Sequence, residues 1–184
     1  FSGMDGGISD LYILNVESGE VRQLTNDRFA DLQPAWHPDG RTLGFTTDRG
    51  ESGTNFRTLE YGEPRLATID TETLDISVYR PFNGLHHNPQ FSPDGRQLYF
   101  ISDHDGFKDV YRLELATDTV YKLTNQKTGV SGITAMSPAM SVAGQNGRMM
   151  YSVFSDSKYT VYARESDDLE GTLVDFSEVD MSTA

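Results

Sequence analysis

A segment that occurs twice at a fixed spacing constrains the fold of this chain more than any other feature. HPDGRTLGFTTD begins at His37, and SPDGRQLYFISD begins at Ser92, 55 positions later. A second pattern, LYILNVESGEVRQLT from Leu11, returns as RLATIDTETLDISVYR from Arg65 and VYRLELATDTVYKLT from Val110. Two independent patterns that recur together indicate a repeated structural unit, and repeats of this length are typical of solenoids and propellers.

Each repeat divides into four short β segments. In the second repeat, an apolar segment at 89–92 leads into Pro93-Asp94-Gly95, which predicts a turn because Pro fixes φ and Gly accepts positive φ. The run 98–101 is almost wholly apolar, as expected of a strand buried on both faces. Two further strands follow, joined by a hairpin turn at 116–119.

Four-stranded antiparallel units at this spacing predict an all-β fold, a propeller with about three blades present. A single blade buries little by itself and needs neighbours on both faces. The alternative is a β-sandwich of irregular strands. We expect aromatic residues at strand positions to form the core between blades: Tyr12, Trp36, Phe45, Phe100, Tyr111 and Tyr151. The predicted units are a partial blade at 10–25, blades at 34–80, 89–125 and 133–164, and an acidic tail at 165–184 that is an edge strand or disordered.

Composition excludes several classes of function. There are 15 Lys and Arg against 28 Asp and Glu, a formal charge of −13, which argues against nucleic acid as a partner because phosphate binding needs clustered cations. The absence of cysteine excludes disulfides and thiolate chemistry. No run of about 18 apolar residues is present, so we expect no membrane span. The chain begins FSGM, which favours a piece of a longer protein.

The turn segments PAWHPDGRTLGFTTDRG and NPQFSPDGRQLYFISDHDG, with the hairpins that follow them, resemble the WD-like repeats of TolB-type β-propellers. The resemblance covers 9–125 well and 133–163 loosely. Leu74 stands where Gly19 ends the first hairpin turn, and Arg80 stands where the other repeats have Thr25 and Thr124. The resemblance implies a six-bladed propeller, of which this chain would be about half. It also implies a bacterial periplasmic or envelope setting, within a larger protein.

Propeller geometry places the Pro-Asp-Gly turns and the outer hairpins at one end of the blades and the longer loops at the other. Variable loops on a rigid scaffold are where binding usually occurs. The sequence therefore predicts binding at the loop end, by Arg49, Asn55, Arg57, His86, His87, Asp103 and Asp105.

For two of the predicted binding residues, His86 and His87, the alternative role is to hold a metal ion. His86 and His87, with Gln90, are residue types that bind divalent ions, and HHNPQFSPDG is similar to propeller lyases that act on pectate fragments and hold manganese with His and Gln. Adjacent strand residues point to opposite faces, which favours ordinary loop histidines and no cofactor. Asp103 begins a segment that resembles an oxygen-ligand loop for calcium, but a carboxylate there is expected to accept bonds from loop amides.

No nucleophile elbow, HExxH zinc motif or phosphate loop is present, so no catalytic residue is assigned. The sequence favours a non-catalytic scaffold that binds a protein or peptide, a basic one given the charge. The enzymatic alternatives are a metal-dependent oligogalacturonate-type lyase and the accessory propeller of a prolyl-oligopeptidase-type peptidase. A purely structural spacer is the third alternative. Because an open half propeller exposes apolar faces, we expect self-association or cover by the rest of a larger chain.

Overall fold

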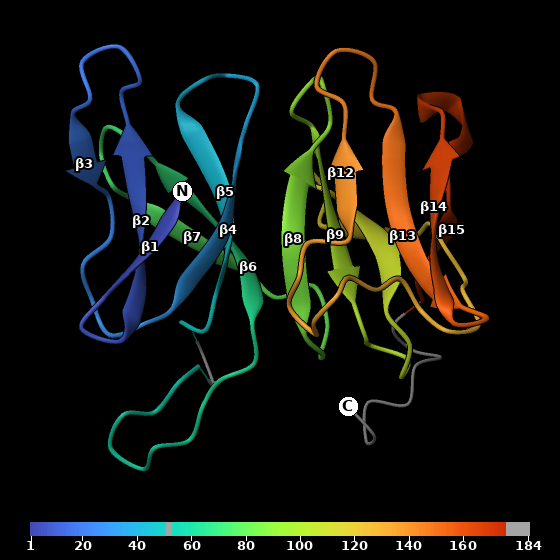
Figure 1. Ribbon diagram of the computed structural model, residues 1–184, viewed down its shortest axis with the longest axis horizontal. Coiled ribbons are helices and arrows are strands. Elements are labelled where there is room, and N and C mark those ends of the chain that lie inside the picture. Colours follow the sequence, from blue (N-terminus) through green and yellow to red (C-terminus); the bar gives the residue numbers. More distant parts are fainter. Residues whose placement is uncertain (51–52, 176–184) are drawn as a thin grey trace.

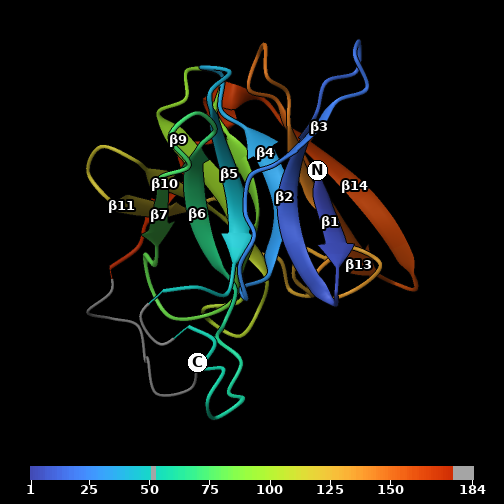
Figure 2. The ribbon, with the colours of Figure 1, turned by 90° about the vertical axis from the view of Figure 1, so that its left-hand side faces the viewer.

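The computed structural model describes residues 1–50 and 53–175. Within them the chain forms four antiparallel sheets that stand side by side in chain order (Figure 1). Seen from the side, the sheets are twisted and the first lies nearest the viewer (Figure 2). The predicted all-β, propeller-type fold is confirmed. Among the described residues, no helix has both the length and the apolar character needed to cross a membrane.

The first sheet has three strands: β1 (Ser2–Asp5), β2 (Ile8–Leu14) and β3 (Val21–Gln23). The sequence indicated only two strands here, within 10–25, so β1 is an addition. Its residues, SGMD, carry no apolar alternation that would mark a strand. A tight turn through Gly6 and Gly7, both at positive φ, folds β1 back onto β2.

The second and third sheets are the complete blades. From the inner to the outer edge their strands are β4 (Asp31–Trp36), β5 (Thr42–Thr47), β6 (Arg65–Asp70) and β7 (Ile76–Tyr79), then β8 (His86–Phe91), β9 (Gln97–Ser102), β10 (Asp109–Glu114) and β11 (Thr119–Lys122). Gly40 and Gly95 have φ of 70° and 72°, so the repeated turn needs the residue that tolerates this conformation. The Pro-Asp-Gly turns are therefore assigned correctly from sequence.

Both inner strands begin three residues earlier than the predicted units at 34 and 89. β4 starts at Asp31 and β8 starts at His86. Each is interrupted by a shift in strand register at Gln33 and Asn88, which both have φ of 55°. Because such a bulge breaks the alternation of side chains, the residues before it do not read as strand in the sequence.

The fourth sheet contains β12 (Met140–Val142), β13 (Met149–Ser155) and β14 (Lys158–Arg164), followed by the short 3-10 helix η1 (Ser166–Asp168). The chain then returns to the third sheet, where β15 (Thr172–Leu173) pairs with the outer strand β11. The tail predicted at 165–184 therefore supplies an edge strand, and 176–184 lies outside the described residues.

The core consists of three apolar clusters, each shared between neighbouring sheets. Along β9, Leu98 and Phe100 belong to the cluster shared with the second sheet, whereas Tyr99 and Ile101 belong to the cluster shared with the fourth. Successive residues of a strand point to opposite faces, so a strand between two neighbours must be apolar at every position. This stacking explains the continuous apolar run that the sequence shows.

Candidate functional site

The connections between strands sort to two ends of the sheets, as the propeller interpretation requires. The turn between β4 and β5 lies at the upper edge in Figure 1, and the long loop between β5 and β6 leaves the lower edge. We call these the turn end and the loop end. The loop end also carries the connections before β8, between β9 and β10, and before β12.

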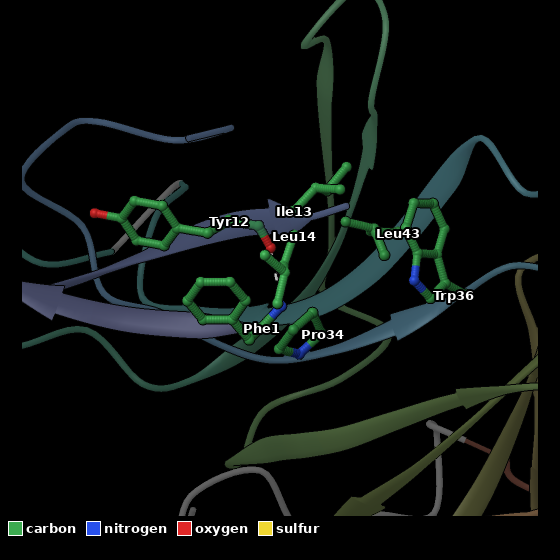
Figure 3. Close-up of a pocket in the computed structure, with 7 residues that line it drawn as sticks. All are labelled: Phe1, Tyr12, Ile13, Leu14, Pro34, Trp36 and Leu43. Carbon is green, nitrogen blue, oxygen red and sulfur yellow. Dashed lines mark hydrogen bonds between the residues drawn. The ribbon is translucent and has the colours of Figure 1, made fainter. Parts of the chain in front are cut away.

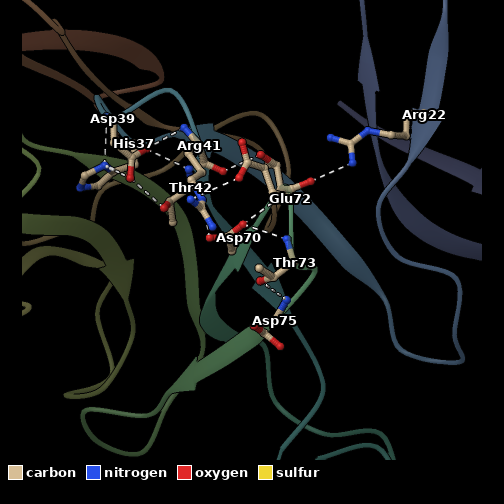
Figure 4. Close-up of polar contacts among 10 residues, drawn as sticks. Arg22, His37, Asp39, Arg41, Thr42, Asp70, Glu72, Thr73 and Asp75 are labelled. Carbon is tan, nitrogen blue, oxygen red and sulfur yellow. Dashed lines mark hydrogen bonds and ion pairs between the residues drawn. The ribbon is translucent and has the colours of Figure 1, made fainter.

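The polar groups of the turn end are used within the turns (Figure 4). The Oδ1 atom of Asp39 accepts hydrogen bonds from the backbone N–H groups of Arg41 and Thr42, both at 2.8 Å. The Arg41 guanidinium donates to Asp70 at 2.6 Å, and Arg22 reaches from the first sheet to the Thr71 carbonyl at 2.8 Å. The turn end is therefore a self-contained polar layer that fixes the blades.

An open pocket of about 280 Å³ lies between the first and second sheets (Figure 3). It is lined by Phe1, Tyr12, Ile13, Leu14, Pro34, Trp36 and Leu43. Trp36 is 52% exposed at its rim, so the expectation that this residue packs in the core is wrong. Trp36 is the last residue of the inner strand β4, where the chain leaves the sheet for the turn. Phe45, Phe100, Tyr111 and Tyr151 are buried as predicted.

At the loop end, Arg49 serves the protein's own structure. Its guanidinium pairs with Asp31, contacts Asp27 at 2.7 Å and donates to the Thr47 hydroxyl at 3.0 Å. Its guanidinium carbon also lies 5.2 Å from the centre of the Phe29 ring. Burial raises the pKa of Asp31, although hydrogen bonds from Arg49 and Thr47 oppose the shift. The predicted binding residue Arg49 is thus engaged in neutralising a buried carboxylate.

Asn55 and Arg57 lie on the loop between β5 and β6. The Asn55 side chain accepts hydrogen bonds from the backbone N–H groups of Arg57 and Thr58, at 3.0 and 3.3 Å, and so shapes the tip of the loop. Arg57 is exposed, and among the described residues it forms no ion pair. Asn55 is therefore used within the loop, and only the exposed Arg57 side chain remains a candidate for contact with a partner.

The two adjacent histidines point to different surroundings, as the strand geometry predicts. His86 is fully buried, with Nδ1 at 3.0 Å from the Ser102 hydroxyl and Nε2 at 2.9 Å from the Phe82 carbonyl. His87 is 1% exposed, and within the described part of the chain neither of its ring nitrogens has a hydrogen-bond partner. Burial lowers the pKa of each ring to about 4, so both are neutral near pH 7.

This geometry does not assemble the metal alternative on His86, His87 and Gln90. Both nitrogens of His86 are engaged, and Gln90 lines a separate groove beside Trp36 and Val142. Among the described residues, no group of three or more His, Asp or Glu side chains converges in an arrangement able to hold a metal ion.

The carboxylates at the loop end hold loop backbone. Asp103 accepts a hydrogen bond from the Leu85 N–H at 2.9 Å, and Asp48, one repeat earlier, accepts from the Ala30 N–H at 2.8 Å. Asp105 pairs with Lys122 at 2.5 Å. The Asp that follows the second strand of each complete blade therefore fixes the loop before it, by accepting a hydrogen bond from that loop's backbone. The sequence predicted this structural role.

Exposed apolar side chains at the loop end were not identified from sequence. Leu59 is 72% exposed, Tyr61 85%, Phe107 55% and Ile133 87%. They come from three different loops without a shared motif, so only the fold brings them to one end. The repeat itself located that end but gave no signal for these residues.

When the sequence is compared with known proteins, each match covers only part of the related protein. No family model matches the chain. The chain is 26% identical over 127 residues to an uncharacterised peptidase, YuxL, of Bacillus subtilis, a match that covers 55% of this chain and 19% of that protein. It is 25% identical over 143 residues to a TolB homologue of Chlorobium luteolum, covering 60% of this chain and 33% of the homologue. The matches thus span between about a fifth and a third of these relatives.

Solved structures agree on the architecture. TolB from Acinetobacter baumannii superimposes with a TM-score of 0.73 at 18% identity, over 94% of this chain and 38% of that one. An oligogalacturonate lyase solved with manganese superimposes with a TM-score of 0.57 at 14% identity, over 84% of this chain and 40% of the lyase. At such identities the likeness is one of fold.

The stacked antiparallel sheets of three to five strands, with turns at one end and loops at the other, define a β-propeller. The propeller is of the TolB-like type, since TolB proteins match both the sequence and the structure.

Proposed function

We propose that the chain is the non-catalytic binding part of a TolB-like propeller and that it binds a protein or peptide at the loop end. The observation that carries the proposal is the group of exposed apolar side chains there, Leu59, Tyr61, Phe107 and Ile133. Exposed aromatic and aliphatic side chains on one face are typical of interaction sites.

A basic partner fits the charge of the chain. With a formal charge of −13, the surface attracts cationic segments, and such attraction weakens as salt screens it. By resemblance to TolB-type propellers, we propose that the protein works in the bacterial periplasm or envelope as part of a larger chain. The partial coverage of the relatives supports a larger chain.

The test uses a library of random peptides displayed on phage and selected against the immobilised chain. We expect the selected peptides to be rich in Lys and Arg, and to bind at least about tenfold more weakly to Tyr61→Ala or Phe107→Ala. The matched control is Val16→Ala at the turn end, where the side chain is 87% exposed. Equal losses for the three variants would refute the assignment of the binding end.

The alternative function is enzymatic. The match to a peptidase favours an accessory propeller that needs a hydrolase domain, and the fold likeness to an oligogalacturonate lyase favours a metal-dependent lyase. A direct assay separates the lyase from the scaffold: the chain is incubated with oligogalacturonate and Mn²⁺, and product absorbance is followed. Turnover that disappears in His87→Ala would favour the lyase over the scaffold.

A further inference from the structure

A cavity of about 220 Å³ opens at the loop end, between the inner strand β8 and the segment that leads into β12. Its lining combines two cationic or titratable side chains, His87 and Lys108, with the segment 130–135 and with Ser137 and Ala139. The cavity therefore lies where the third and fourth sheets meet.

His87 reaches this cavity with unused hydrogen-bonding capacity. Its ring is 1% exposed, yet within the described residues neither nitrogen has a partner, in contrast to the neighbouring ring of His86. Buried polar groups are nearly always hydrogen-bonded, and a group left unsatisfied destabilises the protein. A neutral imidazole offers one N–H donor and one acceptor. An occupant of the cavity would complete these bonds.

Lys108 supplies positive charge on the same cavity. Its ammonium group donates to the Ala135 carbonyl, and the charge is close enough to His87 to contribute to the lowered pKa of that ring. No carboxylate of the described residues lies within ion-pair distance of this ammonium, although the chain as a whole is strongly acidic. An ammonium has three donors, so donors remain for a ligand.

We propose that this cavity binds a carboxylate group, with one oxygen accepting from the His87 ring N–H and the other from the Lys108 ammonium. A carboxylate is acceptor-only, which matches the two donors, and the lysine charge supplies the opposite sign. The cavity size suits a small acid or a single acidic group of a peptide. The inference goes beyond the proposed function, since it concerns a ligand class. Of the four exposed apolar residues only Ile133 lines this cavity, and the carboxylate contacts do not use its side chain.

The experiment uses the four histidines as probes. The whole chain is labelled at the histidine rings, the ring resonances are assigned with single variants, and acetate is titrated at pH 7 against chloride at constant ionic strength. We expect the His87 resonance to move saturably, with half-saturation on the order of 10 mM for so small a ligand. The His86 resonance is the internal control and should stay in place.

Variants and two peptides sharpen the result. Lys108→Met should raise the half-saturation concentration roughly tenfold, because it removes a charged donor. Lys127→Met, at an exposed lysine of a nearby loop, should leave the concentration unchanged. N-acetyl-glycylglycine should bind and its amide should not. If this peptide acid binds more tightly than acetate, the ligand is the carboxyl terminus of a peptide. If acetate binds more tightly, the ligand is a small acid.

Three results would overturn the proposal: no saturable movement of the His87 resonance with acetate, an unchanged titration in Lys108→Met, or binding of the peptide amide as tight as that of the peptide acid. The cavity would then hold water alone. Because acetate binding needs no protein partner, failure here leaves the phage selection at the loop end as an independent test of the proposed function.

Discussion

Two strands with the same place in their blades, β9 and β13, differ in how they are buried. Each follows a Gly-Arg pair. Leu98 and Met149 match, since each pairs with the last residue of the inner strand before it, Phe91 or Val142, and both are buried against the preceding sheet. On the opposite face, Tyr99 is 4% exposed, whereas the matching Met150 is 47% exposed. The difference teaches that the neighbouring blade, rather than the strand itself, provides burial in this fold.

The two outermost faces show the consequence. On the fourth sheet, exposed apolar side chains of the outer face are Met150, Phe154, Tyr159 and Val161, and on the first sheet they are Leu14 and Val21. Large apolar residues repeated on a sheet face indicate a surface that is covered in the working protein. The middle blades are covered on both sides, and the outer ones on only one.

The largest expected effect comes from truncating the matched pair Tyr99 and Met150. Tyr99→Ala should lower the free energy of unfolding by about 3 kcal/mol, because it leaves a cavity between two blades. Met150→Ala should cost less than about 1 kcal/mol, since half of that side chain is already in water. Urea denaturation measures both. Equal losses would show that the outer face is covered in solution.

A second matched pair lies in the turns. Gly40 and Gly95 share a positive φ, but a β-carbon on Gly95 would collide with the His37 ring of the preceding blade, whereas one on Gly40 would meet nothing within 4 Å. We expect Gly95→Ala to lower the free energy of unfolding by about 2 kcal/mol, from backbone strain and the clash together. Gly40→Ala should lower it by about 1 kcal/mol, because backbone strain acts there alone. Melting temperatures give the ranking. A reversed order would contradict the packing of one blade's turn on the next.

How much the sequence could predict follows from the range of the interactions. The Pro-Asp-Gly turns, the apolar run of β9 and the loop end were predicted, because turn chemistry and periodicity are local. The bulge at Asn88 and the pairing of β15 with β11 were not, since a register shift and a distant partner leave no local pattern.

The candidate site divides in the same way. The sequence singled out His87 by residue type but gave no sign of Lys108 beside it, because the two are brought together only when β8 packs near the β9–β10 loop. It also assigned Arg49 to binding, although Arg49 pairs with the buried Asp31, which the predicted blade boundary had left outside the strand.

A further effect, graded with pH, concerns the buried inner strand β8. Burial lowers the pKa of His87 to about 4, below the value of about 6.5 for an unfolded chain. Between these values the unfolded state binds a proton that the folded state does not, so stability falls as pH decreases from 6.5 to 4. The contribution is about 1.4 kcal/mol per pH unit. His87→Phe should reduce the slope by that amount in urea titrations, and an unchanged slope would contradict the burial of the ring.

The most direct test of the central claim, that each blade needs a neighbour on both faces, is the mass in solution of the 184-residue chain expressed alone. Sedimentation velocity and light scattering measure it against the 20.5 kDa of one copy. The exposed faces of the first and fourth sheets predict a dimer or larger species that dissociates when charges replace Met150 and Val161. A monodisperse, cooperatively melting monomer would contradict the account.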